Sequence, residues 1–269
     1  MQVEHFDIGN DYRKEGPCWH KGWHNSWRMN KVYGLEASGR ELEIDCFLSI
    51  LKDICKPHIN LIELGSAWGE WGISLAGVIR TRLIPTVLFG YDYLAVEGEK
   101  YYSELAQEHI DYNRMSGTVI NAAVNDQEGY CYFNKFSGHQ NFFDTWCTQG
   151  ITFGGNIAGS KLKTLVLAIY HFFTGRVAKV PMYTLDTIVK KWNKYPDVIH
   201  MDIEGLEARV LRATSVRPQY WLIGTHSSNL NKEVYSILSR EYDCIKDILP
   251  SKEKVRGIGQ DGLQLWRKK

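Results

Sequence analysis

One segment near residue 60 constrains the fold more than any other part of the chain. An apolar run over residues 59–64 ends in Glu63-Leu64-Gly65, and Gly69 follows before a helix-like segment over residues 71–78. Gly65 allows a tight turn and a close approach of the backbone to a ligand, and Gly69 lets the next helix begin against that turn. The segment is not GxGxxG, and no Lys-Ser/Thr follows it, so neither a dinucleotide fingerprint nor a phosphate loop is supported. The simpler interpretation is a strand–turn–helix unit whose glycines serve packing.

The rest of the chain alternates expected strands with expected helices. Strands are expected within residues 59–64, 86–97, 119–124, 130–134, 198–203, 220–225 and, as strand pairs, 245–266. Helices are expected over residues 38–54, 99–112, 184–191, 206–213 and 232–240. The strand at 130–134 is expected to return from 119–124 through a turn at 126–129. This alternation is typical of an α/β fold with a doubly wound, mostly parallel, Rossmann-like sheet.

Two stretches fall outside the alternation, and we interpret them as additions to a single domain over residues 1–269. Residues 1–37 form an irregular leader, and residues 135–180 form an insertion with a helix-like piece over residues 162–173. The leader carries an aromatic stripe at Trp19, Trp23 and Trp27. Packing is its simpler interpretation, and the alternative is a sugar-stacking surface or an active-site lid. A cluster of Cys18, His20 and His24 has no second cluster at zinc-site spacing, so it does not predict a metal site.

The composition excludes several classes of protein. Hydrophobic residues at 44% and charged residues at 23% are ordinary for a globular chain, and a net charge of +1 argues against a dedicated nucleic-acid binder. The longest apolar run, residues 165–173, is too short to span a membrane. The polar start lacks a secretory signal, and the six scattered cysteines are typical of reduced thiols. We therefore expect a cytoplasmic protein without a membrane span.

A carboxylate at the end of the second expected strand is a candidate ligand for a ribose. Glu97 closes the strand and is followed at once by a helix, and Asp92 is the alternative five residues earlier. A carboxylate in this position can accept hydrogen bonds from both ribose hydroxyls. The simpler interpretation is a solvated charge at the start of a helix.

Acidic residues and a histidine follow two later strands. Asp202, Glu204 and Glu207 lie within six residues, and His226 follows the next strand. Because the carboxyl ends of parallel strands meet at one edge of a sheet, Asp202 and His226 are expected side by side. Such groups can orient an acceptor hydroxyl, take its proton or hold a divalent cation. Glu207 is expected to make a charge contact at the start of its own helix.

Taken in order, these segments resemble a class I S-adenosylmethionine-dependent methyltransferase. The resemblance rests on Glu63-Leu64-Gly65 with Gly69, on residues 96–105, and on residues 121–126 with Gly129. Thr184-Leu185-Asp186 followed by residues 200–207 is similar to the FkbM family within that class. The match runs from about residue 59 to residue 245. The chain departs from the family's frequent residues at Glu63, Gly98 and His200, and its 135–180 insertion is larger than expected.

The resemblance implies S-adenosylmethionine as the cofactor, whose sulfonium already activates the methyl group. The methionine part would face the turn after the first strand, and Glu97 would hold the ribose. The implied cofactor-binding residues are Glu63, Gly65, Ser66, Trp68, Gly69, Glu97, Asn121 and Ala122, the last two near the adenine. The implied catalytic residues are Asp202, His226 and Glu204. His226, with an ordinary pKa near 6.5, or Asp202 would take the acceptor's proton, and Asp202 would orient His226.

The expected activity is O-methyl transfer to a hydroxyl of a sugar or glycosylated metabolite. The expected partners are a small-molecule or glycan acceptor and a second copy of the chain in a homo-oligomer, without nucleic acid. A divalent cation, if the enzyme uses one, would be held by Asp202, Glu204 and His226, although their spacing is not that of a metal motif. Two alternatives stay open. A nicotinamide-dependent sugar oxidoreductase is disfavoured by the missing GxGxxG, and a catalytically silent binding module is disfavoured by the three clustered polar residues.

Overall fold

The computed structural model describes the greater part of the chain from residue 40 onward. The described residues are 40–54, 56–69, 71–72, 90–112, 115–134, 151–152, 169, 173–174, 177–255 and 258–269. The leader over residues 1–37, with its tryptophans and its Cys/His cluster, lies outside them, as does most of the 135–180 insertion. The expected helix after the glycine turn is described only at Trp71 and Gly72, which are helical.

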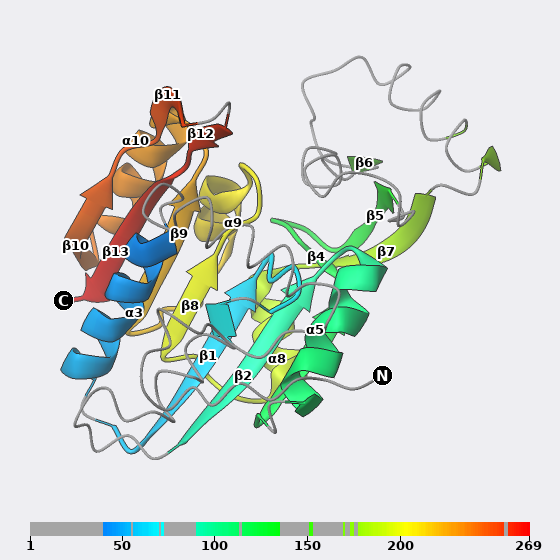
Figure 1. Ribbon diagram of the computed structural model, residues 1–269, viewed down its shortest axis with the longest axis horizontal. Helices are drawn as coiled ribbons and strands as arrows, with labels where there is room; N and C mark the ends of the chain where they lie inside the picture. Colours follow the sequence, from blue (N-terminus) through cyan, green and yellow to red (C-terminus); the bar gives the residue numbers. More distant parts are fainter. Residues whose placement is uncertain are drawn as a thin grey trace.

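A seven-stranded sheet forms the centre of the molecule (Figure 1). Its strands are β1 (His58–Leu64), β2 (Gly90–Glu97), β3 (Gly117–Asn121), β8 (Val198–Met201), β9 (Tyr220–Thr225), β10 (Tyr242–Ile248) and β13 (Gly262–Lys268). They lie in the order β10-β13-β9-β8-β1-β2-β3. The pairs from β9 to β3 are parallel, and β13 runs antiparallel to both β9 and β10. The expected mostly parallel sheet is confirmed.

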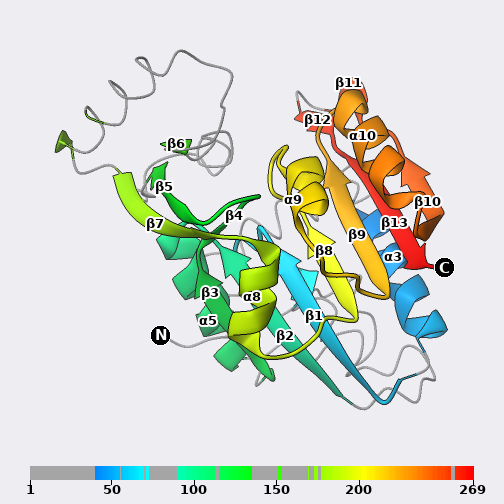
Figure 2. The ribbon, with the colours of Figure 1, turned by 180° about the vertical axis from the view of Figure 1, so that it is seen from behind.

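Helices cover both faces of this sheet (Figures 1 and 2). One face carries α3 (Arg40–Asp53) and α5 (Lys100–Tyr112), and the other carries α8 (Leu185–Trp192), α9 (Glu207–Ala213) and α10 (Ser228–Leu238). Successive residues of a strand point to opposite faces, so Leu61 packs on the α3 side while Ile62 packs on the α8 side. Two buried faces explain why the central strands are continuous apolar runs.

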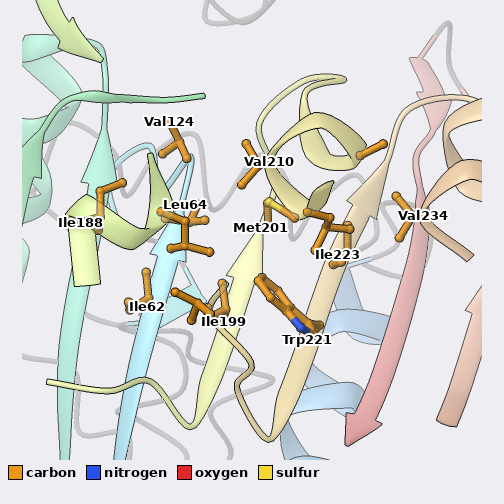
Figure 3. Packing of buried hydrophobic residues seen from close by; sticks show 14 of the residues in the cluster. Ile62, Leu64, Val124, Ile188, Ile199, Met201, Val210, Trp221, Ile223 and Val234 are labelled. Carbon is orange, nitrogen blue, oxygen red and sulfur yellow. The ribbon is translucent and has the colours of Figure 1, made fainter. Parts of the chain in front are cut away.

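The core on the α8 side lies close to the carboxyl ends of the strands. Figure 3 shows Leu64 on β1, Met201 on β8 and Ile223 on β9 packed side by side, with Val210 of α9 above them. Leu64, Met201 and Ile223 are all fully buried. Residues that follow these strands are therefore carried by a rigid apolar layer.

A second, four-stranded sheet overturns two expectations. It contains β4 (Ala123–Val124), β5 (Gly129–Asn134), β6 (Ile151–Thr152) and β7 (Val177–Tyr183), in the order β4-β7-β5-β6. The single strand expected over 119–124 is wrong, because Ala122 interrupts it and donates its amide to the carbonyl of Glu97 (3.0 Å). The expected return of 130–134 along that strand is also wrong, because β5 pairs antiparallel with β7.

The strand β7 was not predicted, because most of it falls in the stretch assigned to the insertion. Val180 and Met182 of β7 pack against Cys131 of β5, and this small core holds the second sheet together. Pairing of segments so far apart in the chain leaves no local signal.

The C-terminal part contains the expected strand pairs. After α10 come β10, a hairpin of β11 (Ser251–Val255) and β12 (Ile258–Gln260), and finally β13. Helix α10 begins at Ser228 rather than at the expected residue 232, because the Ser227 side chain caps it by accepting the amide of Leu230 (3.2 Å). No helix within the described ranges is both long and apolar enough to cross a membrane.

Candidate active site at the carboxyl edge of the sheet

The glycine turn after β1 lies against the main chain that follows β8. Gly65 (φ +77°) and Gly69 (φ +81°) both take left-handed conformations, as does Ala67 between them (φ +46°). The amide of Gly65 donates to the carbonyl of Val96 (3.0 Å). A Cβ on residue 65 would overlap the backbone oxygen of Asp202. Glycine is therefore required at position 65 both for its conformation and for the close approach of two chain segments.

The other two candidates in the turn, Ser66 and Trp68, are buried. The Ser66 hydroxyl has no hydrogen-bond partner among the described residues, so it is an orphaned polar group beside the turn. The Trp68 indole packs on Tyr102 of α5, with ring centroids 6.1 Å apart. The carbonyl of Trp68 lies 3.0 Å from Nδ1 of His109. Trp68 thus anchors the turn to α5, whereas a cofactor contact at Ser66 stays a prediction.

Glu63 is buried beneath the turn rather than exposed at the end of its strand. Its carboxylate accepts hydrogen bonds from the Tyr93 hydroxyl and from the amide of Gly72 (2.9 Å). His200, its register partner on β8, has Nδ1 4.0 Å from Oε1 of Glu63. Burial raises the pKa of Glu63, against the effect of His200. Glu63 therefore holds the start of the helical segment at Trp71–Gly72, and its contact with a cofactor stays a prediction.

Three of the expected cofactor residues lie together at the ends of β2 and β3. The two carboxylate oxygens of Glu97 accept the amides of Ala67 (2.8 Å) and Glu99 (2.7 Å). The Asn121 side chain donates to the carbonyl of Glu97 (2.9 Å), and the amide of Ala122 donates to the same carbonyl. Burial raises the pKa of Glu97 to about 7 despite its bonds to backbone amides.

Asp92, the alternative to Glu97, is not at this edge. It lies within β2 opposite Asn60 and forms ion pairs with His58 (2.9 Å) and Lys194 (2.7 Å). Of these two carboxylates, Glu97 is the one that lies beside the glycine turn.

Asp202, Glu204 and His226 meet where β8 and β9 end. Oδ1 of Asp202 lies 2.9 Å from Nε2 of His226, and Oε2 of Glu204 lies 3.7 Å from Nδ1. The expectation that Asp202 and His226 lie side by side is confirmed. Glu204 reaches the histidine because it takes a left-handed conformation (φ +57°) and Gly205 (φ +100°) completes a tight turn before α9.

Two further carboxylates face the same imidazole. Oε1 of Glu207 lies 3.3 Å from Nε2 of His226, and Oδ1 of Asp261 lies 3.3 Å from Nδ1. Glu207 is fully buried and also accepts the amide of Ile203 (3.0 Å), so it bonds to the turn before its helix as well as to His226. Asp261 was missed because no local signal marks it. It reaches the site because Gly262 pairs with Thr225 across β13 and β9.

The surrounding carboxylates set the charge of His226. Burial acts to lower its pKa, but contacts with Asp202, Asp261 and Glu207 outweigh burial and raise the pKa well above the ordinary value. Burial raises the pKa of Glu204 to about 7, although His226 opposes the shift. Burial also acts against ionised Asp202, but its contact with His226 prevails and lowers its pKa. The imidazole therefore carries its proton at neutral pH, unlike a histidine with the ordinary pKa near 6.5.

The glycine turn is in contact with the acid–histidine cluster (Asp202, Glu204, Glu207, His226 and Asp261). The amide of Asp202 donates to the carbonyl of Leu64 (2.9 Å), directly before the turn. On the other side, a Cβ on Gly224 of β9 would lie 3.0 Å from Oδ1 of Asp202. Small residues on both flanking strands thus leave room for the Asp202 backbone and carboxylate.

The family comparison identifies the class of protein. The family described as the Methyltransferase FkbM domain matches residues 87–244, more than half of the chain. This chain belongs to the FkbM methyltransferase family. The matched range contains Glu97, Asn121, Asp202, Glu204 and His226, whereas the glycine turn at 65–69 precedes it. No curated protein sequence matches this FkbM-family chain significantly.

Solved structures similar to this FkbM-family protein include several methyltransferases. A putative class I S-adenosylmethionine-dependent methyltransferase from Listeria monocytogenes is 11% identical, with 92% of this chain and 67% of that chain covered and a TM-score of 0.45. TrmK from M. capricolum, in complex with S-adenosylhomocysteine, is 10% identical over 82% and 67%, with a TM-score of 0.44. Precorrin-6y C5,15-methyltransferase from Geobacter metallireducens is 10% identical over 82% and 85%, with a TM-score of 0.38. Similarity at this level carries no activity over to this chain.

Proposed function

We propose that this protein transfers a methyl group from S-adenosylmethionine to a hydroxyl of a sugar or glycosylated metabolite. The observation that carries the proposal is the contact between Gly65 and Asp202, which joins the glycine turn to the acid–histidine cluster. Methyl transfer to oxygen requires the acceptor in line with the methyl–sulfur bond and a means of removing its proton. A cofactor on the turn and an acceptor on the cluster would be neighbours.

The turn and the ends of β2 and β3 fit the cofactor. The orphaned Ser66 hydroxyl and the close approach allowed at Gly65 and Gly69 suit its methionine part. Each carboxylate oxygen of Glu97 keeps a lone pair beyond its amide bond, enough for the two ribose hydroxyls. Asn121 and Ala122, which bond to the end of β2, would border the adenine. When bound, the cofactor supplies a methyl group already activated on a sulfonium.

Glu63 and Trp68 would act on the cofactor through the shape of the turn. Glu63 holds the backbone at Gly72, and Trp68 packs the turn against α5. Both side chains are buried, so each is a positioning residue in this proposal.

The acid–histidine cluster would receive the acceptor. Asp202, Glu204 and His226 would orient the reacting hydroxyl, and neighbouring carboxylate oxygens can accept hydrogen bonds from adjacent hydroxyls of a sugar. In the transfer, the acceptor oxygen would bond to the methyl carbon as the carbon–sulfur bond breaks with its electron pair going to sulfur, and an ionised carboxylate of the cluster would take the hydroxyl proton.

Isothermal titration with S-adenosylhomocysteine tests the cofactor half of the proposal. We expect the wild type to bind and Glu97→Ala to weaken binding by about tenfold or more, because two hydrogen bonds to a charged group are lost. Glu97→Gln keeps one acceptor oxygen and should fall between them. Glu104→Ala, an exposed position on α5, is the matched control and should bind as the wild type does. Failure of the wild type to bind would end the proposal, and binding of a nicotinamide dinucleotide instead would favour the oxidoreductase.

A transfer assay tests the acceptor half. The enzyme is incubated with methyl-labelled S-adenosylmethionine and a panel of free sugars, glycosides and sugar nucleotides, and labelled product is measured. Asp202→Asn and His226→Gln should lower kcat by about 10²–10⁴-fold while S-adenosylhomocysteine affinity is kept. Full rates in both variants would remove the catalytic assignment. Cofactor binding without transfer to any hydroxylated acceptor would favour a catalytically silent module.

A further inference from the structure

We infer that Asp202, Glu204 and His226 form a binding site for one divalent cation on the acceptor side of the sheet. The role of the cation rests on the proposed function, since it would act on the acceptor hydroxyl, but its binding does not. One ligand atom from each of the three residues can be chosen so that all lie within 4.8 Å of one another. Opposite ligands of an octahedral ion with bonds of about 2.1–2.4 Å lie about 4–5 Å apart. The three atoms therefore fit around one ion with little movement.

Unsatisfied atoms inside the cluster point to the same conclusion. Oε2 of the fully buried Glu207 has no hydrogen-bond partner among the described residues, while its Oε1 faces Nε2 of His226. Oδ1 of Asp202 and Nε2 of His226 are also buried, and they face each other at ion-pair distance (2.9 Å). Burying a carboxylate oxygen without a hydrogen-bond donor costs folding free energy, and a bound cation beside the oxygen would offset that cost.

The charge balance of the cluster supports a doubly charged ligand. Four carboxylates surround one imidazole, and no Lys or Arg in the described ranges forms an ion pair with any of them. The cluster therefore brings four acidic side chains together around a single basic one. A divalent cation would offset this excess of acidic groups, and the imidazole would bind it through a lone pair.

The donor set indicates which cation to expect. Two carboxylates and one imidazole offer both oxygen and nitrogen ligands. This set suits Mn²⁺ better than it suits Ca²⁺ or Mg²⁺, which prefer oxygen ligands alone. Glu207 and Asp261 lie within 3.3 Å of opposite ring nitrogens of His226, so one of them can hold the nitrogen that faces away from the ion. A carboxylate in that position fixes the orientation of a metal-bound histidine.

A cation here would resolve how the acceptor loses its proton. An alcohol bound to a divalent cation has a lowered pKa, so its proton can leave to water before the oxygen attacks the methyl group. The site would then need no side chain to act as the base.

Binding of Mn²⁺ to the protein without cofactor or acceptor tests the inference directly. Free Mn²⁺ is measured by its electron paramagnetic resonance signal during titration of the full chain. We expect one ion per wild-type chain, with affinity lowered about tenfold or more in Glu204→Gln and His226→Gln. Glu104→Gln is the matched control, an exposed carboxylate on α5 that should leave Mn²⁺ binding unchanged. At the same Mn²⁺ concentration, the thermal unfolding midpoint should rise more in the wild type and the control than in Glu204→Gln.

The outcomes separate this inference from the proposed function. If the wild type binds no Mn²⁺, or if Glu204→Gln binds it as tightly as Glu104→Gln, the cation site is overturned. If methyl transfer then continues at full rate in excess chelator, the proposed function holds without a cation. Conversely, site-specific Mn²⁺ binding in a protein that does not bind S-adenosylhomocysteine would support the cation site and contradict the proposed function.

Discussion

Gly65 and Asp202 lie directly against each other at the carboxyl edge of the sheet. The amide of Asp202 bonds to the carbonyl of Leu64, and there is no space for a Cβ on Gly65 beside the Asp202 carbonyl. One backbone contact thus connects the turn that would hold the cofactor with the cluster that would hold the acceptor. The contact joins the two parts through the main chain, so substitutions at Gly65 and substitutions around the Asp202 side chain should have different effects.

Gly65→Ala should be far more harmful than alanine at another left-handed glycine. A Cβ added to Gly205 (φ +100°) would meet nothing within 4 Å, so Gly205→Ala costs only the strained conformation, about 1–2 kcal/mol of unfolding free energy. Gly65→Ala adds the overlap with Asp202, and we expect a loss of about 3 kcal/mol or more. Urea unfolding of both variants measures the difference. Equal losses would show that the contact with Asp202 relaxes cheaply.

Gly224→Ala should impair catalysis without weakening cofactor binding. The added methyl would lie 3.0 Å from Oδ1 of Asp202 and would push this short, buried carboxylate out of place. We expect a fall of about tenfold or more in kcat, as for a misplaced catalytic group, with S-adenosylhomocysteine affinity within about twofold of wild type. Steady-state kinetics and calorimetry on one preparation check both halves. A matching loss of cofactor affinity would mean that the two sides are not separable.

Cofactor affinity should rise with pH around neutrality because of Glu97. Its pKa is raised to about 7, chiefly by burial, with Glu99 adding to the shift and the amides of Ala67 and Glu99 opposing it. Below that pH the side chain is neutral and accepts weaker hydrogen bonds from the ribose; above it, the carboxylate makes charge-assisted ones. Calorimetry with S-adenosylhomocysteine at pH 6 and pH 8 should show tighter binding at pH 8. The Glu97→Gln variant binds the same ligand but lacks the titrating carboxylate. If its affinity changes with pH as much as that of the wild type, the pH dependence comes from another group.

Glu63 should matter more for stability than for direct contact with the cofactor. Tyr93→Phe and Glu63→Gln both weaken the buried bond between these side chains, and each should lower the free energy of unfolding by about 1–3 kcal/mol. The affinity of the folded protein for S-adenosylhomocysteine should change by less than about threefold, well under one lost charged hydrogen bond. Denaturant unfolding and calorimetry provide the two measurements. A large loss of affinity in Glu63→Gln alone would instead place the carboxylate on the cofactor, as the resemblance implies.

Much of the central sheet was predictable because its signals are local. The apolar run before Gly65 and the strand Tyr220–Thr225 show their type within a few residues, and Thr184 and Ser227 provide helix-capping hydroxyls. The pairing of Asp202 with His226 also followed from local information, because both come directly after strands that run parallel.

The second sheet was not predictable in the same way. The strand β7 lies between β4 and β5 in its sheet, and both of these partners come much earlier in the chain, so no local pattern indicates the pairing. The burial of Glu63 was missed for a related reason: a carboxylate in an otherwise apolar strand gives no indication of which partner, here Tyr93, lies on its face of the sheet.

By itself, the amino-acid sequence determined most of the strands and helices of the central sheet, the glycines that the turn requires, and the family. Hydrophobic period, helix caps and glycine conformation are properties of short segments, so they can be recognised without the fold. Only the tertiary structure decided that Glu207 and Asp261 join Asp202 and Glu204 around His226. That cluster depends on β13 lying beside β9, and its electrostatics depend on burial and on distances between residues far apart in the chain. Because these contacts join residues far apart in the chain, only the fold shows that His226 lies at the centre of a candidate cation site.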